Sequence, residues 1–517
     1  MAEEDLIFGK NRHFFGGIEP SNMLDFRAVV NNGVVKVTAT LPNDTVVDSQ
    51  TLCTVEGAII RRKTTDYPKD EFDGDLVADI KESTVFTDSG ASPTETYYYA
   101  AFPYTTQGVY NRNKANRTTT IIKSHYLYGY DLTVGTANPS DRVTYPSDVD
   151  NAGFTPAAMD FSSGVFNYGS WNIEPGTEFM PRPCMLTYAG VVDHYLDPDD
   201  YTKKTDGSAS SVSNPSFGGN AMMEWPKIWT KRWEENGVYH FRCSNVQIDG
   251  DYECWCNYDR LNNQIDHFYT PIFYGSNVSN KMRSISGQSN LVDQNTSTEI
   301  AYAKANGNDW YIEVLADRLL IQDLLVLMAK STDGQTAYGS GRSAGGDNIA
   351  IGQGTMDTKG MFWGSNDGTS GVKVFGMENL WGNLWRRTAG WINANGTQKV
   401  KLTRGTHDGS NATDYNTDGS GYLTVSGATP SGNSGGYIKT MKTMPYGRIP
   451  YDLTGSATTH EADGIFYNNS GTMYVLVGGN WGCGLIGGPF HAGLCYGVTD
   501  SYMYYGAALS CKPRATV

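Results

Sequence analysis

Residues 478–511 read GGNWGCGLIGGPFHAGLCYGVTDSYMYYGAALSC, and we interpret the rest of the chain outward from this stretch. Between residues 482 and 505 it holds six glycines, two cysteines and four tyrosines, but no lysine, arginine, glutamate or glutamine. Glycine-rich loops are normally solvated and polar, so this composition is unusual. Tyrosine together with glycine and serine is typical of a binding surface, because tyrosine provides rigid contact area at low entropic cost. The alternative is a glycine-rich β core with stacked tyrosines.

The spacing of the glycine and apolar residues favours the binding surface. The stretch carries GGNW at 478–481, GPF at 488–490, Leu494 and GAA at 506–508. This pattern resembles the variable region of diversity-generating retroelement target proteins. The resemblance implies a C-type-lectin-like fold in which Trp481, Phe490 and Leu494 belong to a fixed frame. Members of that family bind ligands, and the best known are phage receptor-binding proteins.

The resemblance also implies which positions vary. In that family a mutagenic reverse transcriptase randomises adenines in template codons, most of which encode Asn. Changing the first two bases of an Asn codon cannot yield Met, Trp, Lys, Glu or Gln. The positions expected to derive from Asn all hold residues that this route reaches: Gly482, Cys483, Ile486, Gly493, Cys495, Tyr496, Asp500, Tyr502 and Tyr504. His491 and Tyr505 also fall where the family often varies, whereas Met503 is not reachable. We call these positions, without Met503, the predicted variable face.

Composition limits the classes of function. The chain has 517 residues, which suggests about two to four domains. Its formal charge of -15 argues against nucleic-acid binding, which needs a basic patch. Charged residues make up 18%, with 59 glycines and 33 tyrosines, which is typical of a β-rich, loop-heavy extracellular or virion protein.

Targeting signals are not visible in the sequence. No run approaches the ~18 apolar residues of a transmembrane helix, so we predict no membrane insertion. The opening MAEEDLIFGK lacks the apolar region of a signal peptide. We therefore expect a protein made in the host cytoplasm and released by lysis, as virion parts are. A plain cytosolic protein is the alternative.

Cysteine and histidine patterns indicate no metal centre. The eight cysteines show no disulfide framework, and Cys254-Trp255-Cys256 is too tight for a usual zinc site. We predict free, mostly buried thiols. The eight histidines show no metal-ligand spacing. Residues 414–419 begin like a calcium loop, but Val425 stands where that pattern needs Glu. We predict a solvated turn there and no cofactor, and leave a structural calcium ion elsewhere open.

The same patterns predict no catalytic residues. Formylglycine-generating relatives of the lectin fold use a reactive Cys pair. The late Cys483 and Cys495 lie at expected variable positions instead, so we predict no such activity. Virion glycosidases use paired carboxylates, and the sequence does not show which acidic residues share a cleft.

Four segments are predicted along the chain: an N-terminal segment 1–20, a fibronectin type III-like domain 21–122, a connector 123–178 and a C-type-lectin-like domain 179–517. Period-2 alternation predicts strands at 34–40, 57–63 and 95–102. TYYYAAFPYTTQGVY at 96–110 resembles the late strands of fibronectin type III domains. Such modules are usually spacers, so we assign no chemistry to this region.

Within the lectin-like domain, three features are predicted. Met222–Trp233 alternates like a strand, confined to a sheet edge by Pro226, with 237–242 as its hairpin partner. Apolar residues at helical spacing predict a core helix over Trp310–Lys330, capped by Asn308 or Asp309. Gly376–Arg387 resembles the GNVWEW-type motif of the formylglycine-generating-enzyme branch, with Trp381 and Trp385 on one face of a short helix beneath the binding surface.

The sequence therefore predicts a mainly β chain with some α, a β-sandwich followed by a lectin-like α+β domain. The expected function is that of a phage or prophage tail fibre that binds a bacterial surface protein or glycan. Other tail proteins are expected partners, and the resemblance implies a homotrimer. The alternatives are a virion-associated glycan-degrading enzyme and a structural decoration protein.

Tyr496, Tyr502 and Tyr504 are the best contact candidates, because tyrosine is enriched among residues that carry interface energy. Asp500 would add polar selectivity, while Gly482 and Gly493 would shape the surface. Replacing the three tyrosines by Ala is predicted to abolish cell binding and to leave the melting temperature nearly unchanged.

Overall fold

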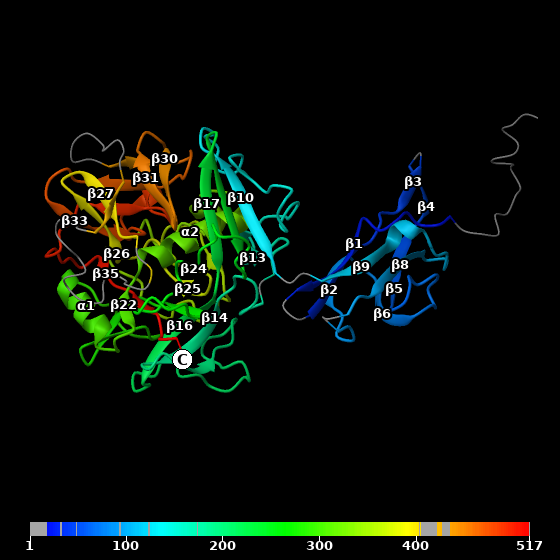
Figure 1. The fold of residues 1–517 in the computed structure, drawn as a ribbon, viewed down its shortest axis with the longest axis horizontal. Coiled ribbons are helices and arrows are strands. Elements are labelled where there is room, and N and C mark those ends of the chain that lie inside the picture. The colour runs from blue at the N-terminus through cyan, green and yellow to red at the C-terminus, as the bar shows by residue number, and fades with distance from the viewer. Residues whose placement is uncertain are drawn as a thin grey trace, which may run out of the picture. The chain divides into compact units, whose positions relative to one another are not determined.

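The computed structural model is mainly β with some α (Figure 1), which confirms the predicted fold class. It describes residues 18–515, except 32–33, 48, 93–94, 123–124, 173, 403, 405–420 and 426–434. The chain divides after Tyr126 into two compact units. The predicted segment 1–20 lies outside the described residues apart from its last three.

The first unit is a β-sandwich built on one continuous strand order, β6-β5-β8-β9-β1-β2-β7. Its strands are β1 (Asp25–Asn31), β2 (Val34–Thr40), β5 (Val55–Lys63), β6 (Asp75–Ile80), β7 (Thr84–Thr87), β8 (Tyr98–Thr105) and β9 (Arg117–Ile122), with a separate hairpin of β3 (Thr45–Val47) and β4 (Gln50–Cys53) and a 3-10 turn η2 (Lys114–Asn116). Parallel pairing of β1 with β9 joins the two halves. Val37 of β2, Ile60 of β5 and Tyr99 of β8 meet in one core cluster, so side chains from both halves fill the interior.

Helix α2 (Leu315–Ala329) runs through the middle of the second unit (Figure 1). Ala316 alone of its fifteen residues is not buried, and a helix enclosed on all sides belongs to a core. The predicted start at Trp310 is wrong. Trp310–Ile312 forms strand β22, which pairs with Leu509–Cys511, and Val314 occupies the N-cap position without a side-chain hydrogen bond. An apolar run reads alike as buried strand or buried helix, so periodicity alone could not separate them.

Several sheets surround this helix, and two of them receive strands from the C-terminal stretch. The six-stranded sheet orders β15 (Val192–Tyr195), β14 (Arg182–Thr187), β16 (Gly219–Pro226), β19 (His267–Pro271), β36 (Leu509–Cys511) and β22. The eight-stranded sheet orders β28 (Leu423–Thr424), β27 (Thr397–Val400), β26 (Trp385–Ala394), β33 (Thr472–Val477), β34 (Ala492–Leu494), β32 (Gly464–Tyr467) and β29 (Gly436–Tyr437), with β35 (Tyr505–Gly506) beside β26.

Smaller sheets and helices complete the second unit. They are the four-stranded sheet β11 (Val143–Thr144), β10 (Leu127–Thr133), β18 (Val238–Ser244) and β17 (Trp229–Glu235); the three-stranded sheet β23 (Trp363–Gly364), β24 (Val372–Val374) and β25 (Met377–Glu378); the pairs β12 (Ala158–Asp160) with β13 (Val165–Asn167), β20 (Ser276–Val278) with β21 (Lys281–Arg283), and β30 (Thr440–Met444) with β31 (Gly447–Asp452); and helices α1 (Thr296–Lys304) and α3 (Gly334–Tyr338). Because β10 pairs along its length with β18, the residues predicted as a connector lie within this unit from Leu127 onward.

Two local predictions in this unit are corrected. The predicted strand Met222–Trp233 is two strands, β16 and β17, in different sheets, and the predicted hairpin partner is β18. Pro226 does not mark an edge, since β16 lies between β14 and β19 and Pro226 is its last residue. The segment Gly376–Arg387 contains no helix: positive φ at Gly376, Asn379, Gly382 and Asn383 bends it from β25 into β26.

Candidate ligand-binding face

The stretch that carries the predicted variable face is held at both ends. β33 precedes it in the eight-stranded sheet, and β36 ends it in the six-stranded sheet, between β19 and β22. Between these ends, β34 pairs with β33 and β32, and β35 pairs with β26. A segment that contributes strands to two sheets is part of the scaffold rather than a free loop.

Hydrogen bonds from other parts of the chain hold the backbone between these strands. The Gly484 amide donates to the Ser343 carbonyl at 2.7 Å, and the Trp385 amide donates to the Tyr504 carbonyl at 3.0 Å. The Asp293 amide donates to the Tyr502 carbonyl at 3.1 Å. On the side of the stretch, each of these bonds uses main-chain atoms, which every residue type except proline provides. Replacing a side chain in the stretch therefore leaves these bonds in place.

Arg318 and Gln322 of α2 are frame residues that sequence reasoning missed. The Arg318 guanidinium donates to the carbonyls of Leu380 at 2.8 Å and Pro489 at 3.0 Å, and the Gln322 side chain also donates to Pro489. One buried arginine thus joins the central helix, the turn before β26 and the variable stretch. The polar side chains of Arg318 and Gln322 inside an apolar helical run were the sequence signal for this role, because a polar side chain must find partners when it is buried.

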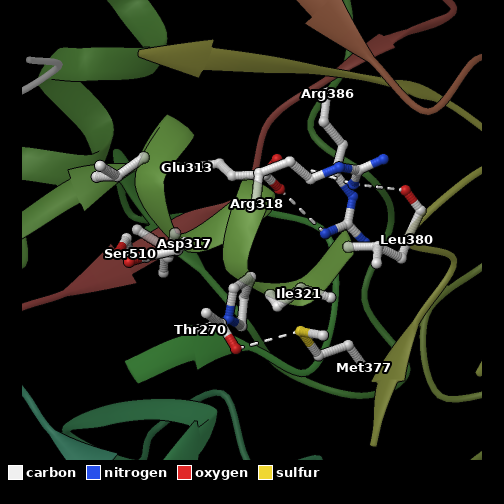
Figure 2. A pocket seen from close by; sticks show the side chains of 12 residues that line it. Thr270, Glu313, Asp317, Arg318, Ile321, Met377, Leu380, Arg386 and Ser510 are labelled. Atoms are coloured by element: carbon white, nitrogen blue, oxygen red, sulfur yellow. Dashed lines mark hydrogen bonds and ion pairs between the residues drawn. The ribbon is translucent and has the colours of Figure 1, made fainter. Parts of the chain in front are cut away.

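Figure 2 shows the surroundings of this arginine. Arg318 and Arg386 lie beside Glu313, at 3.9 and 3.4 Å from its carboxylate. The void that these residues line encloses about 10 Å³, which is room for one water molecule and not for a ligand. A larger hollow of about 230 Å³ is lined by polar residues such as Gln264, His267 and Arg514, and none of its lining residues belongs to residues 478–511.

The structure buries the five predicted frame residues, Trp481, Phe490, Leu494, Trp381 and Trp385. The Trp481 indole donates to Asn348 at 3.1 Å, and the Trp381 indole donates to the carbonyl of Gly339 at 3.0 Å. Trp385 lies beneath the stretch, with its ring centroid 4.7 Å from that of His491. These side chains form the floor on which the predicted variable face rests.

The predicted variable face is divided by burial. Gly482 and Tyr502 are exposed, and six members are partly exposed: Cys483, Ile486, Cys495, Tyr496, Asp500 and Tyr504. His491, Gly493 and Tyr505 are buried. Gly493 can still shape the surface, because its backbone lies under the ring of Tyr496. A direct ligand contact by His491 or Tyr505 is not available in this structure, since both side chains are fully buried, which corrects that part of the prediction.

His491 has a structural environment instead. Its Nδ1 bonds the carbonyl of Gly464 at 2.5 Å, which fixes the neutral tautomer with the proton on Nδ1. Burial lowers the pKa of His491 to about 4, because the charged form would lose its hydration. The imidazole is therefore neutral at physiological pH and acts as a packing group between Trp385 and Phe466.

Four tyrosines gather at one point of the face. Tyr505 lies at the centre, with its ring centroid 5.1 Å from Tyr496, 5.0 Å from Tyr502 and 5.0 Å from Tyr504. Tyr502 and Tyr504 stack at 5.2 Å with an interplanar angle of 7°. Tyr502 is 45% exposed, while Tyr496 and Tyr504 are half-buried. The predicted contact residues are therefore brought together around one buried ring, and we name Tyr496, Tyr502, Tyr504 and Tyr505 the tyrosine cluster.

This placement changes one expectation. Tyr504 packs edge-on against Trp481 at 6.3 Å as well as against Tyr505, so its removal would cost packing. Tyr496 is likewise partly buried, over Gly493 and beside Trp385. We therefore no longer expect the triple alanine variant to keep its melting temperature, and Tyr502 alone remains a clean test of contact.

The two cysteines of the face are free thiols, as are the other six. Burial raises the pKa of both Cys483 and Cys495 to about 11, so the reactive thiolate is scarce at neutral pH. Across the described residues, no group of three or more His, Cys, Asp or Glu side chains could hold a metal ion. The calcium-like residues 414–419 lie outside the described part. No described helix is long and apolar enough to cross a membrane.

Comparisons with known proteins add little. No protein-family model matches the chain, and no curated protein matches it. Among solved structures, the M60 catalytic domain with the CBM51-1 and CBM51-2 domains from Clostridium perfringens ZmpB matches with 12% identity and a TM-score of 0.15. The match covers 47% of this chain and 31% of that chain. A likeness at this TM-score carries no argument about fold or function.

Proposed function

We propose that this chain is a receptor-binding protein of a phage or prophage tail, in which a C-type-lectin-like scaffold displays a retroelement-diversified face to a bacterial surface ligand. The observation that carries the proposal is the separation of roles within residues 478–511. Main-chain atoms and buried aromatic rings hold the stretch, while most predicted variable side chains reach the surface.

This separation supports diversification for a physical reason. A binding site keeps its geometry only if its supporting residues are fixed by packing and hydrogen bonds of their own. Here the supports are Trp481, Trp385 and Arg318, none of which belongs to the predicted variable face. Exchange of an exposed side chain such as Tyr502 then changes the surface offered to a ligand without unfolding the scaffold.

The proposed setting is a tail fibre with several copies of the face, a homotrimer among the arrangements that the family resemblance implies. Linking copies would raise weak single-site affinity by roughly 10²–10⁴ in avidity. The first unit, a β-sandwich, would then act as a spacer, and other tail proteins would be its partners. Recognition, not catalysis, is the proposed mechanism.

The first test is the DNA beside the gene. We expect a near-copy of the 3′ coding end that differs from it at adenines, next to a reverse-transcriptase gene. The differences should fall at the codons of the predicted variable face and spare those of Trp481, Phe490 and Leu494. Differences spread evenly over frame and face codons, or no such copy, would remove the basis for diversification.

The second test is binding to a panel of bacterial strains. Purified protein is expected to bind at least one strain, and Tyr502→Ala is expected to reduce binding while the protein stays folded. Sugar released from host capsule or wall glycan would instead indicate a degrading enzyme. Binding to no strain, together with incorporation into virions, would indicate a structural decoration protein.

A further inference from the structure

The one charged side chain in the stretch that carries the tyrosine cluster is negative. Residues 478–511 contain no lysine or arginine, and Asp500 is their one acidic residue. Asp500 is partly exposed. Burial raises the pKa of Tyr504 and of Tyr505, and the nearby charge of Asp500 raises both further. The main chain of Asp293, an exposed residue, lies beside Tyr502, since its amide donates to the Tyr502 carbonyl. Two acidic residues therefore border the cluster, Asp500 through its charge and Asp293 through its main chain.

A cation close to the cluster, Arg387, faces inward. The Arg387 guanidinium lies 5.8 Å from the ring centroid of Tyr505, and it is fully buried. Its Nε donates to Glu299 at 2.6 Å, and Nη2 donates to the carbonyl of Asp500 at 3.2 Å. A cation that is buried and paired cannot meet a ligand. Asp293 and Asp500, the two acidic residues that border the cluster, do reach solvent.

Aromatic ring faces add to this preference. The face of a tyrosine ring is the negative end of its quadrupole and attracts a cation placed over it. Tyr502 stacks on Tyr504, meets Tyr505 at an interplanar angle of 78°, and is 45% exposed as a residue. An exposed tyrosine bordered by acidic residues is the chemistry that receives an ammonium or guanidinium group.

The neighbouring surface favours a protein as the source of that group. Met503, between Tyr502 and Tyr504 in the chain, is 58% exposed and apolar. Its sulfur is only a weak acceptor for the hydroxyls of a glycan, whereas apolar contact with tyrosine at the centre is typical of protein interfaces.

We propose that the tyrosine cluster, with Asp293 and Asp500, receives a lysine or arginine side chain of a bacterial surface protein. The inference rests on the proposed function, because it names the chemistry of the ligand at that same face. In the complex, the cation lies over Tyr502 while the two carboxylates balance its charge.

The probe for the test is an immobilised peptide of four lysines spaced by Gly and Ser, compared with the same peptide after Nε-acetylation. Binding is measured by biolayer interferometry at low and high NaCl. Tyr502→Phe keeps the ring and Tyr502→Leu removes it at similar volume. Asp293→Asn with Asp500→Asn removes two charges at the cluster, and Asn keeps an oxygen for the Gly497 amide that Asp500 binds. The matched control removes two exposed carboxylates elsewhere, Asp148→Asn with Asp266→Asn.

We expect binding to the lysine peptide that falls at least tenfold on acetylation and weakens with added salt. Tyr502→Leu and the cluster double variant should each bind about three- to tenfold more weakly, while Tyr502→Phe and the matched control bind as the original protein does. No effect of acetylation, or an equal loss in the matched control, would overturn the inference, because net charge alone would then explain the binding.

Binding to strains distinguishes this failure from failure of the proposed function. If Tyr502→Leu abolishes strain binding but acetylation of cell-surface amines has no effect, the face is a receptor site for another chemistry and the inference fails alone. If purified host glycan competes with strain binding, the inference likewise fails alone, because the ligand of the face is then a glycan. If Tyr502→Leu binds strains as the original protein does, the proposed function of the face fails as well.

Discussion

Replacing Trp481 and Tyr502 by Ala, one at a time, separates the frame from the face. Trp481 is 4% exposed, packs with Tyr274 and Leu384, and donates its indole proton to Asn348. Truncating such a side chain leaves a cavity, and Trp→Ala in a core costs about 3–5 kcal/mol. Tyr502 is 45% exposed and loses mainly its ring contacts with the other tyrosines, which are worth about 0.5–1.5 kcal/mol. We therefore expect a difference of about 1.5–4.5 kcal/mol between the two variants.

Tryptophan fluorescence during denaturant unfolding measures this difference in the right part of the chain. All eleven tryptophans lie at residue 171 or later, so the signal reports the second unit and not the sandwich. Trp481→Ala still leaves ten reporters. The unfolding midpoint should drop clearly for Trp481→Ala and little for Tyr502→Ala. Equal drops would refute the division into frame and face, because Tyr502 would then be a core residue.

Three further outcomes are expected. Gly488→Ala places a Cβ 2.0 Å from the Asp463 carboxylate and should lower the free energy of unfolding by about 1–3 kcal/mol. The Cβ of Gly482→Ala meets nothing nearer than 3.6 Å, so that variant should keep its melting temperature. A larger loss of stability in Gly482→Ala than in Gly488→Ala would contradict the backbone placement. Because the pKa of His491 is lowered to about 4 from 6.5, its contribution to stability is complete above pH 6.5 and is lost as pH falls toward 4, by up to about 1.4 kcal/mol per pH unit. Urea midpoints measured from pH 7 to pH 5 should therefore fall less in His491→Asn than in the original protein. Equal slopes in the two proteins would mean that the imidazole titrates normally. Iodoacetamide should alkylate Cys483 and Cys495, with pKa about 11, slowly at pH 8 in the native protein, and the rate should rise roughly tenfold per pH unit up to pH 10. Mass spectrometry measures this rate. A rate that stays constant above pH 8 would show that the thiolates are already formed.

Local periodicity predicted the elements whose partners lie close in the sequence. Val34–Thr40 alternates between core and surface along β2, and the β17–β18 hairpin joins neighbouring strands. The body of α2 was also visible, because fifteen residues of mostly apolar sequence leave few alternatives to a buried helix. In each case the side chains of the segment itself carry enough information to choose the backbone conformation.

Elements that depend on distant partners were predicted less well. Trp310–Ile312 is a strand because Leu509–Cys511 pairs with it, and nothing in the local sequence names that partner. Residues 127–133 look like a connector until β18 supplies the pairing edge. The turn before β26 depends on left-handed residues such as Asn379 and Asn383, which interrupt a helix that Trp381 and Trp385 suggested by spacing alone.

The candidate site shows the same division. The tyrosines were found from composition, and their mutual contacts agree with the expectation that they lie together. Composition could not say which of them faces water, because Tyr504 and Tyr505 are adjacent and of the same type, yet Tyr504 is partly exposed and Tyr505 is buried. Arg318 was missed for a related reason: its carbonyl partners, Leu380 and Pro489, lie 62 and 171 residues further along the chain.

The position of the C-terminal strand explains how a glycine-rich surface can be fixed at all. Glycine costs conformational entropy on folding, so a segment this rich in glycine folds only if other parts of the chain hold it. Here β36 is inserted between β19 and β22, and Arg318 holds the stretch from the central helix. The stability of the surface therefore comes from residues outside it. Its exposed side chains, such as that of Tyr502, contribute little to the stability of the fold. A face built in this way can change its chemistry at Tyr502 while the free energy of folding remains in the core.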